Sequence, residues 1–221
     1  GTIIINKATG TVNGAVDLNV ITNVADYKVV NNNGVYTIEE KHYVAQVDGV
    51  QYETFAAAVA AAPAGGTVTL IADATEDATV VLTKNLTIDG ADKTFTGAIE
   101  FKKANGSFTV KNVKFNGAGN RVYALKSQAS VTSLTVEKCE ATGYTYGFLY
   151  ANKAVANAIV NNVTVKDVNY GVHSAYGTNV TLNNFVAENV KNGVMVQNYG
   201  TRNVVLNNCS FTGCETPLYI W

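Results

Sequence analysis

One short phrase recurs along the chain from Gly66 onward, and it predicts a β-strand at each occurrence. The phrase has three positions: the first is apolar, the second is usually Thr, and the third is again apolar. The residues at the first position of its seven occurrences are Val68, Leu86, Phe108, Leu134, Ala158, Val180 and Val204. The intervals between these members are 18, 22, 26, 24, 22 and 24 residues, a narrow spread for seven occurrences. Such a period is typical of a solenoid, in which each repeat is one coil packed on the next.

Each repeat contains two further apolar patterns, so we expect three short strands per coil. The period-2 alternation of the first strands predicts that the seven first members form one buried column, because a one-residue slip would turn the core outward. Short turns before the third strands contain Gly147, Gly171, Gly193 and Pro217. Aligning these turns predicts a second inward column made of Ala124, Phe148, Val172, Val194 and Leu218.

A polar pair follows the first strand of each repeat and predicts a tight corner. Its second member is Asn at four of the repeats, namely Asn112, Asn162, Asn184 and Asn208. Asn tolerates the left-handed backbone conformation, and its amide can bond to the equivalent amide of the next coil. We therefore expect a ladder of stacked Asn side chains along this corner.

These corners, together with the Ala-rich segment 54–62, resemble the right-handed parallel β-helix proteins of the pectate-lyase-like, secreted or cell-surface bacterial type. The resemblance covers residues 48–221. It implies an all-β fold of about seven coils, with an N-terminal capping helix over about residues 52–62. It does not imply one activity, because this scaffold carries lyases, hydrolases, adhesins and inert spacers.

The first 47 residues do not fit the repeat. We interpret residues 1–47 as a small β appendage that contains a hairpin over about 27–38, because an Asn-Gly turn lies between two alternating runs. Residues 48–221 then form the solenoid. The last residues align with the middle of a coil, so we expect the native protein to continue past Trp221. The chain also begins without Met, which is typical of a processed or trimmed chain.

Composition excludes several classes of function. The 221 residues carry a net charge of −1, and only two of the sixteen basic residues are Arg, which argues against a nucleic-acid partner. No apolar run approaches the ~20 residues of a membrane span. The three cysteines, Cys139, Cys209 and Cys214, are expected to be buried thiols, because the two that share an inward column are three coils apart.

The sequence predicts no catalytic residue, no metal site and no other cofactor. Pectate-lyase-like enzymes usually bind Ca²⁺ through several carboxylates on one strand face, and polygalacturonase-like enzymes use two or three Asp on adjacent coils. The nearest carboxylates here, Asp167 and Glu188, fall on a turn and on a different strand. We interpret Lys166 with Glu188, and Lys114 with Glu140, as opposite charges stacked in adjacent coils.

The outer face of the third strands is the predicted binding site. If the second inward column is correct, an apolar stripe faces outward and contains Leu125, Leu149, His173, Met195 and Tyr219. Exposed apolar stripes usually mark interaction sites, and Tyr rings suit sugars and protein partners. We predict ligand contacts from Leu149, His173, Tyr176, Met195, Tyr199 and Tyr219.

The first hypothesis is therefore a secreted or surface-exposed bacterial β-helix module that binds a glycan or a protein partner without catalysis in this segment. One alternative is a polysaccharide lyase or glycoside hydrolase whose catalytic residues are non-standard or missing. Another is a structural spacer or stalk. An outward column of Thr residues also admits ice binding, although β-branched residues favour strands for simpler reasons. The oligomeric state is left open.

Overall fold

A computed structural model describes residues 2–176, 179–199 and 203–221, with the side chains of residues 198 and 199 left out. The chain forms two compact units, Gly1–Tyr43 and Val44–Trp221. The sequence analysis placed the boundary after residue 47. Residues 45–47 form β6 (Ala45–Val47), which pairs within the second unit.

The first unit contains five short strands. The parallel pair is β1 (Thr2–Ile5) with β3 (Asn19–Thr22). The antiparallel sheet has the order β2 (Thr11–Asn13), β5 (Val35–Glu40) and β4 (Tyr27–Asn32). Asn33 and Gly34 join β4 to β5 with φ angles of 52° and 88°. Two successive positive φ angles define the turn that matches the twist of a hairpin.

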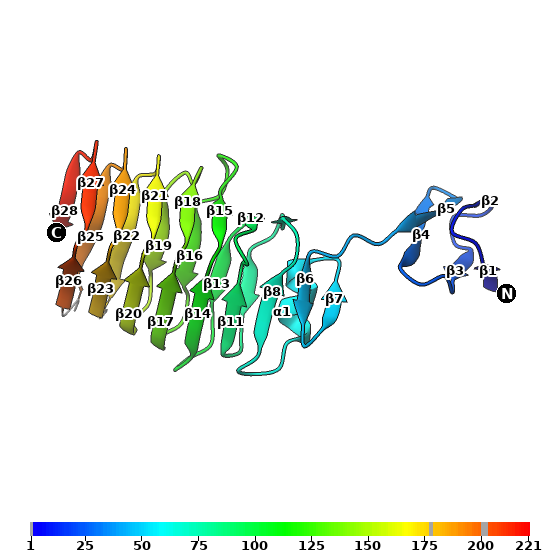
Figure 1. The fold of residues 1–221 in the computed structure, drawn as a ribbon, viewed down its shortest axis with the longest axis horizontal. Helices are drawn as coiled ribbons and strands as arrows, with labels where there is room; N and C mark the ends of the chain where they lie inside the picture. The colour runs from blue at the N-terminus through cyan, green and yellow to red at the C-terminus, as the bar shows by residue number, and fades with distance from the viewer. Residues whose placement is uncertain (1, 177–178, 200–202) are drawn as a thin grey trace. The chain divides into compact units, whose positions relative to one another are not determined.

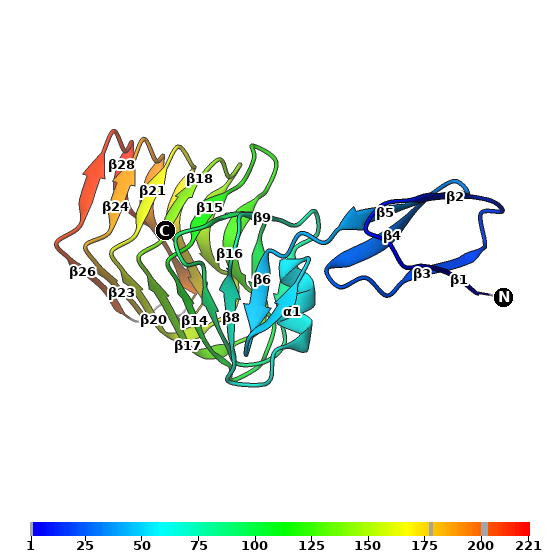
Figure 2. The same ribbon diagram turned by 45° about the vertical axis from the view of Figure 1, so that its right-hand side comes forward.

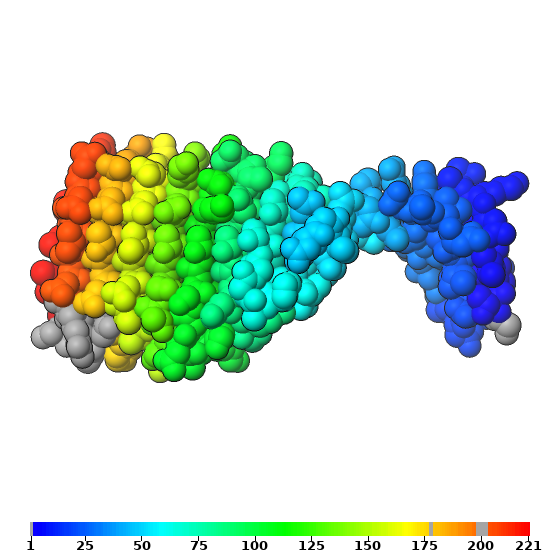
Figure 3. Space-filling view, turned by 60° about the horizontal axis from the view of Figure 1, so that its bottom comes forward, coloured from blue at the N-terminus to red at the C-terminus, as the bar shows by residue number. Residues whose placement is uncertain are grey.

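The second unit is a parallel solenoid of three sheets, seen side-on in Figure 1 and obliquely in Figure 2. Each coil appears as a band in chain order in Figure 3. Sheet 1 contains β6 and β7 (Val50–Tyr52), then β8 (Thr67–Leu70), β11 (Leu86–Asp89), β14 (Ser107–Lys111), β17 (Val131–Glu137), β20 (Val155–Asn161), β23 (Asn179–Asn183) and β26 (Asn203–Asn207).

Sheet 2 contains β9 (Ala74–Thr75), β12 (Thr94–Thr96), β15 (Lys114–Asn116), β18 (Glu140–Thr142), β21 (Thr164–Lys166), β24 (Val186–Glu188) and β27 (Ser210–Thr212). Sheet 3 contains β10 (Val80–Leu82), β13 (Ile99–Phe101), β16 (Tyr123–Ser127), β19 (Gly147–Ala151), β22 (Tyr170–Tyr176), β25 (Asn192–Tyr199) and β28 (Thr216–Ile220). The predicted all-β solenoid is therefore confirmed, although it completes about six turns rather than the expected seven.

The predicted column of sheet 1 is confirmed in register at six of its seven members, all of them buried except the half-buried Val204. Leu86, Phe108, Leu134, Ala158, Val180 and Val204 pair in sequence from β11 to β26. The prediction was wrong for Val68, which is buried but pairs with Ile88 rather than Leu86. The two-residue offset keeps Val68 on the inward face, because alternate residues of a strand share a face.

The predicted inward column of sheet 3 was wrong by one residue in its first two coils. Leu149 pairs with Leu125 on one side and with Val172 on the other. Leu125 and Leu149 are 0% and 1% exposed, so both belong to the core and not to the outer face. Ala124 and Phe148 are also buried, one position earlier in their strands.

The error has a physical cause at the corner that precedes sheet 3. Gly147 pairs with Tyr170, so Phe148 corresponds to Gly171, whereas the sequence alignment matched the two glycines. A Cβ at Gly171 would lie 2.4 Å from the Gly193 carbonyl oxygen and 3.0 Å from the Phe185 ring, which fills the same interior space. The core is therefore filled from different chain positions in different coils, and a glycine is not a fixed marker of the corner.

One helix, α1 (Phe55–Ala61), precedes β8 and contacts β6, β7, β8 and β10. Thr54 caps its N-terminus, and the Thr54 hydroxyl accepts a hydrogen bond of 3.1 Å from the Ala57 amide. Phe55 is buried with its ring centroid 4.9 Å from that of Phe95. The helix is shorter than the expected 52–62, because Tyr52 belongs to β7.

The predicted Asn ladder is confirmed for three of its four members at the corner between sheets 1 and 2, whereas the amide of the fourth, Asn112, donates to Asp89. Asn162, Asn184 and Asn208 have φ angles of 53°, 51° and 51°. The Asn184 amide donates to the Asn162 Oδ1 at 2.9 Å, and the Asn208 amide donates to the Asn184 Oδ1 at 2.7 Å. Each amide thus bonds along the solenoid axis while its backbone makes the left-handed turn.

Candidate ligand-binding face

The outer face of sheet 3 carries a column of large side chains. The strand registers place one residue per coil in this column: Val81, Glu100, Lys126, Tyr150, His173, Met195 and Tyr219. Its charged members lie in the early coils, where the Lys126 amine is 3.7 Å from the Glu100 carboxylate. Its later members are aromatic or apolar.

Five rings form a stacked cluster in the middle of this face. The Tyr150 ring stacks on Tyr123 at 4.6 Å and on His173 at 4.6 Å, and Tyr146 stacks on Tyr170 at 4.4 Å. Each such pair contributes about 0.5–1.5 kcal/mol beyond its buried area. Because Tyr150 uses both faces on neighbouring rings, the cluster presents ring edges and hydroxyls outward rather than open ring faces.

His173 is the most enclosed member of the cluster. The imidazole residue is 3% exposed although it lies on an outward position, because Tyr146, Tyr150 and Tyr170 surround it. Neither ring nitrogen has a hydrogen bond of acceptable geometry among the described residues. Burial lowers the pKa of His173, and the nearby Gln197 side chain opposes this effect in part. The neutral imidazole is the favoured form.

The hydroxyls of Tyr123, Tyr146 and Tyr150 stay protonated at neutral pH. Burial, followed by the influence of Tyr170, raises the pKa of Tyr146 to about 12. Burial also raises the pKa of Tyr123 and of Tyr150. The face therefore offers neutral hydroxyl groups, which can both donate and accept hydrogen bonds.

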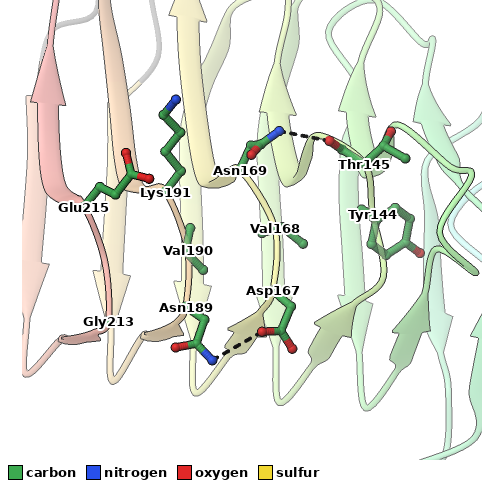
Figure 4. Close-up of a pocket in the computed structure, with 10 residues that line it drawn as sticks. All are labelled: Tyr144, Thr145, Asp167, Val168, Asn169, Asn189, Val190, Lys191, Gly213 and Glu215. Carbon is green, nitrogen blue, oxygen red and sulfur yellow. Dashed lines mark hydrogen bonds between the residues drawn. The ribbon is translucent and has the colours of Figure 1, made fainter.

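A polar groove of about 510 Å³ runs along the corner between sheets 2 and 3 (Figure 4). Turns from successive coils line it, and most of their side chains are polar. The Asn169 amide donates to the Thr145 carbonyl at 3.0 Å, and the Asn189 amide donates to the Asp167 carboxylate at 3.3 Å. Lys191 and Glu215 occupy equivalent positions in adjacent coils, since Asn192 pairs with Thr216.

A second depression, of about 420 Å³, adjoins this groove on sheet 3. Lys191 lines both spaces, and Asn169 of the groove is followed directly by Tyr170 of the depression. The depression is lined by Tyr170, Lys191, Asn192, Met195, Thr216, Tyr219 and Trp221. The hydrogen-bonding groups of the corner groove thus lie directly beside the aromatic and apolar residues of the depression.

The two carboxylates of the groove do not form a close pair. Asp167 and Glu215 lie two coils apart, or roughly 10 Å by strand spacing, and Figure 4 shows Asn189, Val190 and Lys191 on the coil between them. Among the described residues, no group of three or more His, Cys, Asp or Glu side chains is placed to hold a metal ion. The arrangement can bind polar groups but offers no matched acid and base.

The predicted site residues are only partly brought together. His173, Met195 and Tyr219 share the outward column of sheet 3, as predicted, although His173 and Met195 are 3% and 8% exposed. Leu149 was assigned wrongly and is a core residue. Tyr176 is exposed, with the Lys153 amine 6.0 Å from its ring centroid. The side chain of Tyr199 lies outside the described residues.

Sequence reasoning missed the polar half of this surface. Tyr146 and Tyr170 are one repeat apart and each directly precedes a glycine, so the spacing of these two rings was visible in the sequence. Asn169 and Lys191 gave no such signal, because they lie in turns whose residues vary from coil to coil.

No curated protein and no solved structure gives a significant match to the chain. No helix among the described residues has both the length and the apolar character needed to cross a membrane. Residues 97–218 match the family model described as "Right handed beta helix region". This match covers more than half of the 221 residues, and the chain therefore belongs to the right-handed β-helix family.

Proposed function

We propose that this protein is a secreted or cell-surface bacterial β-helix module, pectate-lyase-like in architecture, that binds a glycan without catalysis in this segment. The binding surface in this proposal is the polar corner groove together with the adjoining aromatic depression of sheet 3. A protein partner is the competing ligand for the same surface, and the experiment below separates the two.

One observation carries the proposal: a groove rich in amides and charged groups continues into an aromatic floor. A sugar ring has the matching chemistry, with hydroxyls around its rim and an apolar face of C–H groups. Asn169, Asn189 and Lys191 supply donors for the hydroxyls, while Tyr170 and Tyr219 supply aromatic surface.

The non-catalytic part of the proposal rests on the carboxylates. Glycosidases of most families place two carboxyl groups about 5–9.5 Å apart across the bond they cleave. Asp167 and Glu215 are separated by two coils, and Asp167 is bonded to Asn189. The alternative is a lyase or hydrolase with non-standard catalytic residues. An enzyme of either kind would release new reducing ends from a bound polysaccharide.

The test is binding of the purified chain to a glycan array, followed by calorimetric titration of each bound oligosaccharide. The double variant Asn169→Ala/Lys191→Ala should weaken binding at least tenfold, because it removes donors from the centre of the groove. A matched control, Thr135→Ala, changes a half-buried residue on the outer face of sheet 1 and should leave affinity unchanged.

Equal affinity of wild type and double variant for an array-positive glycan would refute the proposed surface. No binding to any glycan, together with capture of a protein ligand that the double variant loses, would refute the glycan and support a protein partner. Reducing ends that accumulate with time would refute the non-catalytic assignment.

A spacer or stalk is the second candidate function, and the stacked ring cluster favours it. Tyr150 contacts Tyr123 and His173 on its two faces, so both ring faces are occupied within the protein. In this second proposal the stacked rings stabilise the solenoid and do not contact a ligand. A spacer predicts no ligand in the titrations above and a mechanical or thermal stability that falls when Tyr150 is replaced by Ala.

A further inference from the structure

Sheet 2 carries a separate groove of about 550 Å³ on its outer face. The strands of this sheet from β12 to β27 are three residues long, so the first and third residues of each strand face outward while the second is inward. The inward residues Phe115, Ala141 and Val165 are buried, which confirms this alternation. Two outward columns therefore run along the solenoid axis, one from the first residues and one from the third.

Long and short side chains alternate between these columns in a diagonal pattern. In β15 and β18 the first column carries Lys114 and Glu140, and the third residues are short. In β21 and β24 the pattern reverses, and the third residues are Lys166 and Glu188. Short residues therefore fill the complementary positions, namely Asn116, Thr142, Thr164 and Val186.

The charges on this face also follow a regular order. From β15 to β24 each strand contributes one charge, in the order positive, negative, positive and negative: Lys114, Glu140, Lys166 and Glu188. The flanking strands β12 and β27 contribute only Thr and Ser outward. Reversing the direction of the axis turns every positive position into a negative one, and the neutral ends exchange places.

We propose that this face pairs with the same face of a second copy of the chain in an antiparallel dimer. The two-fold axis lies in the plane of the interface, across the solenoid axis, between β18 and β21. A two-fold interface uses the same patch on both copies, so a patch that is complementary to its own reversed image meets the requirement.

The rotation sets long side chains of one copy over short side chains of the other. Lys114 lies over the partner copy's Val186 position, beside Glu188 of the partner subunit. Glu140 lies over the partner copy's Thr164 position, beside Lys166 of the partner subunit. The two remaining contacts follow by symmetry, so shape and charge agree at all four strands.

Ion pairs within one chain leave these charged side chains accessible to a second copy. Lys166 and Glu188 are 2.7 Å apart, yet their side chains are 49% and 39% exposed. Glu188 raises the pKa of Lys166, which stays charged. Exposed pairs of this kind contribute little to folding, and their charges remain open to a facing surface.

The size of the face makes the dimer weak. Six strands of three residues cover roughly 24 Å by 10 Å, well below the ~800 Å² per partner of a standard stable interface. The association is therefore concentration-dependent and sensitive to salt. It is independent of the glycan proposal, because none of the four charged residues lines the corner groove.

Sedimentation velocity and equilibrium on the whole chain test the dimer. Wild type should associate at low ionic strength and dissociate in about 0.5 M salt, where charges are screened within a few ångströms. The variant Glu140→Lys/Glu188→Lys carries only positive charges on the face and should be monomeric. The variant Lys114→Glu/Lys166→Glu should also be monomeric, and the two variants mixed should form a heterodimer.

A fourfold reversal, Lys114→Glu/Glu140→Lys/Lys166→Glu/Glu188→Lys, is the matched control, since it keeps the alternation and the net charge and should associate like wild type. Circular dichroism and thermal melts establish that all variants are folded. The proposal is overturned if wild type stays monomeric at millimolar concentration in low salt. It is also overturned if the all-positive variant associates as well as wild type, or if the mixed variants fail to pair.

Discussion

The substitution Leu149→Ala tests the placement of β19, the strand that sequence alignment put one residue out of register. Leu149 is 1% exposed and lies between Leu125 and Val172 in the core. An outward Leu149 would cost almost nothing to truncate, since surface substitutions usually change stability by less than about 0.5 kcal/mol. The two registers therefore predict clearly different free energies of unfolding.

The expected magnitude follows from the atoms removed. Leu→Ala deletes three carbon atoms, which is about 2.4 kcal/mol at ~0.8 kcal/mol for each buried group. The surrounding strands are held by ladders on both sides and cannot collapse fully, so a residual cavity adds to this cost. We expect a total loss of about 3–4 kcal/mol in the free energy of unfolding.

The assay is urea unfolding followed by circular dichroism, with hydrogen exchange of the β19 amides as a local measure, because solenoids can lose coils separately. Ile159→Ala is the matched control: Ile159 is 39% exposed on the outer face of sheet 1, and its loss should cost under about 1 kcal/mol. Equal effects of the two substitutions would refute the register of sheet 3.

Three further predictions concern titration, the Asn ladder and the thiols. The pKa of His173 is lowered in the folded protein, so below the ordinary pKa of about 6.5 the unfolded chain binds more protons than the folded chain. The free energy of unfolding should therefore fall as the pH drops through this value. His173→Phe should remove that part of the pH dependence, as urea titrations at several pH values would measure. Asn184→Ala should lower the free energy of unfolding by about 2 kcal/mol and Asn184→Gly by about 1, since both lose the ladder bonds but only Ala is strained at a φ of 51°. Burial raises the pKa of Cys139 to about 12, so its thiol should react with iodoacetamide much more slowly than the half-buried Cys214, as peptide mass mapping would measure; equal rates would contradict the burial.

The sequence predicted those features of the fold that recur from one coil to the next. The inward residues of sheet 1 from β11 to β26 and the left-handed corners after these strands recur at fixed positions, since strand pairing and left-handed turns restrict which residues fit. The corner before sheet 3 was not predictable in the same way. There Phe148 fills the interior of one coil, while Phe185 fills the interior of another. A similar side-chain volume is thus supplied from different positions within the repeat.

The candidate site was predicted at the level of the face but not at the level of its residues. The stripe from His173 to Tyr219 indicated the outer side of sheet 3. The enclosure of His173 could not be inferred, because it depends on Tyr146 and Tyr170 reaching across from the strand ends. The polar groove was missed because its side chains come from turns, which carry no periodic hydrophobic signal.

The corner between sheets 2 and 3 explains how one stretch of chain serves two different surfaces. Lys166 and Glu188 end their strands on the outer face of sheet 2, and the next residues, Asp167 and Asn189, line the corner groove. Asp167 and Asn189 have φ angles of 55° and 53°, so the backbone swings sharply between the two positions. Because the turn directs neighbouring polar residues to different surfaces, substitutions at 166 and 188 change the charge pattern of sheet 2 while leaving the lining of the groove in place. The proposed self-association and the proposed ligand binding can therefore be tested one at a time, which is the condition for assigning a function to each surface.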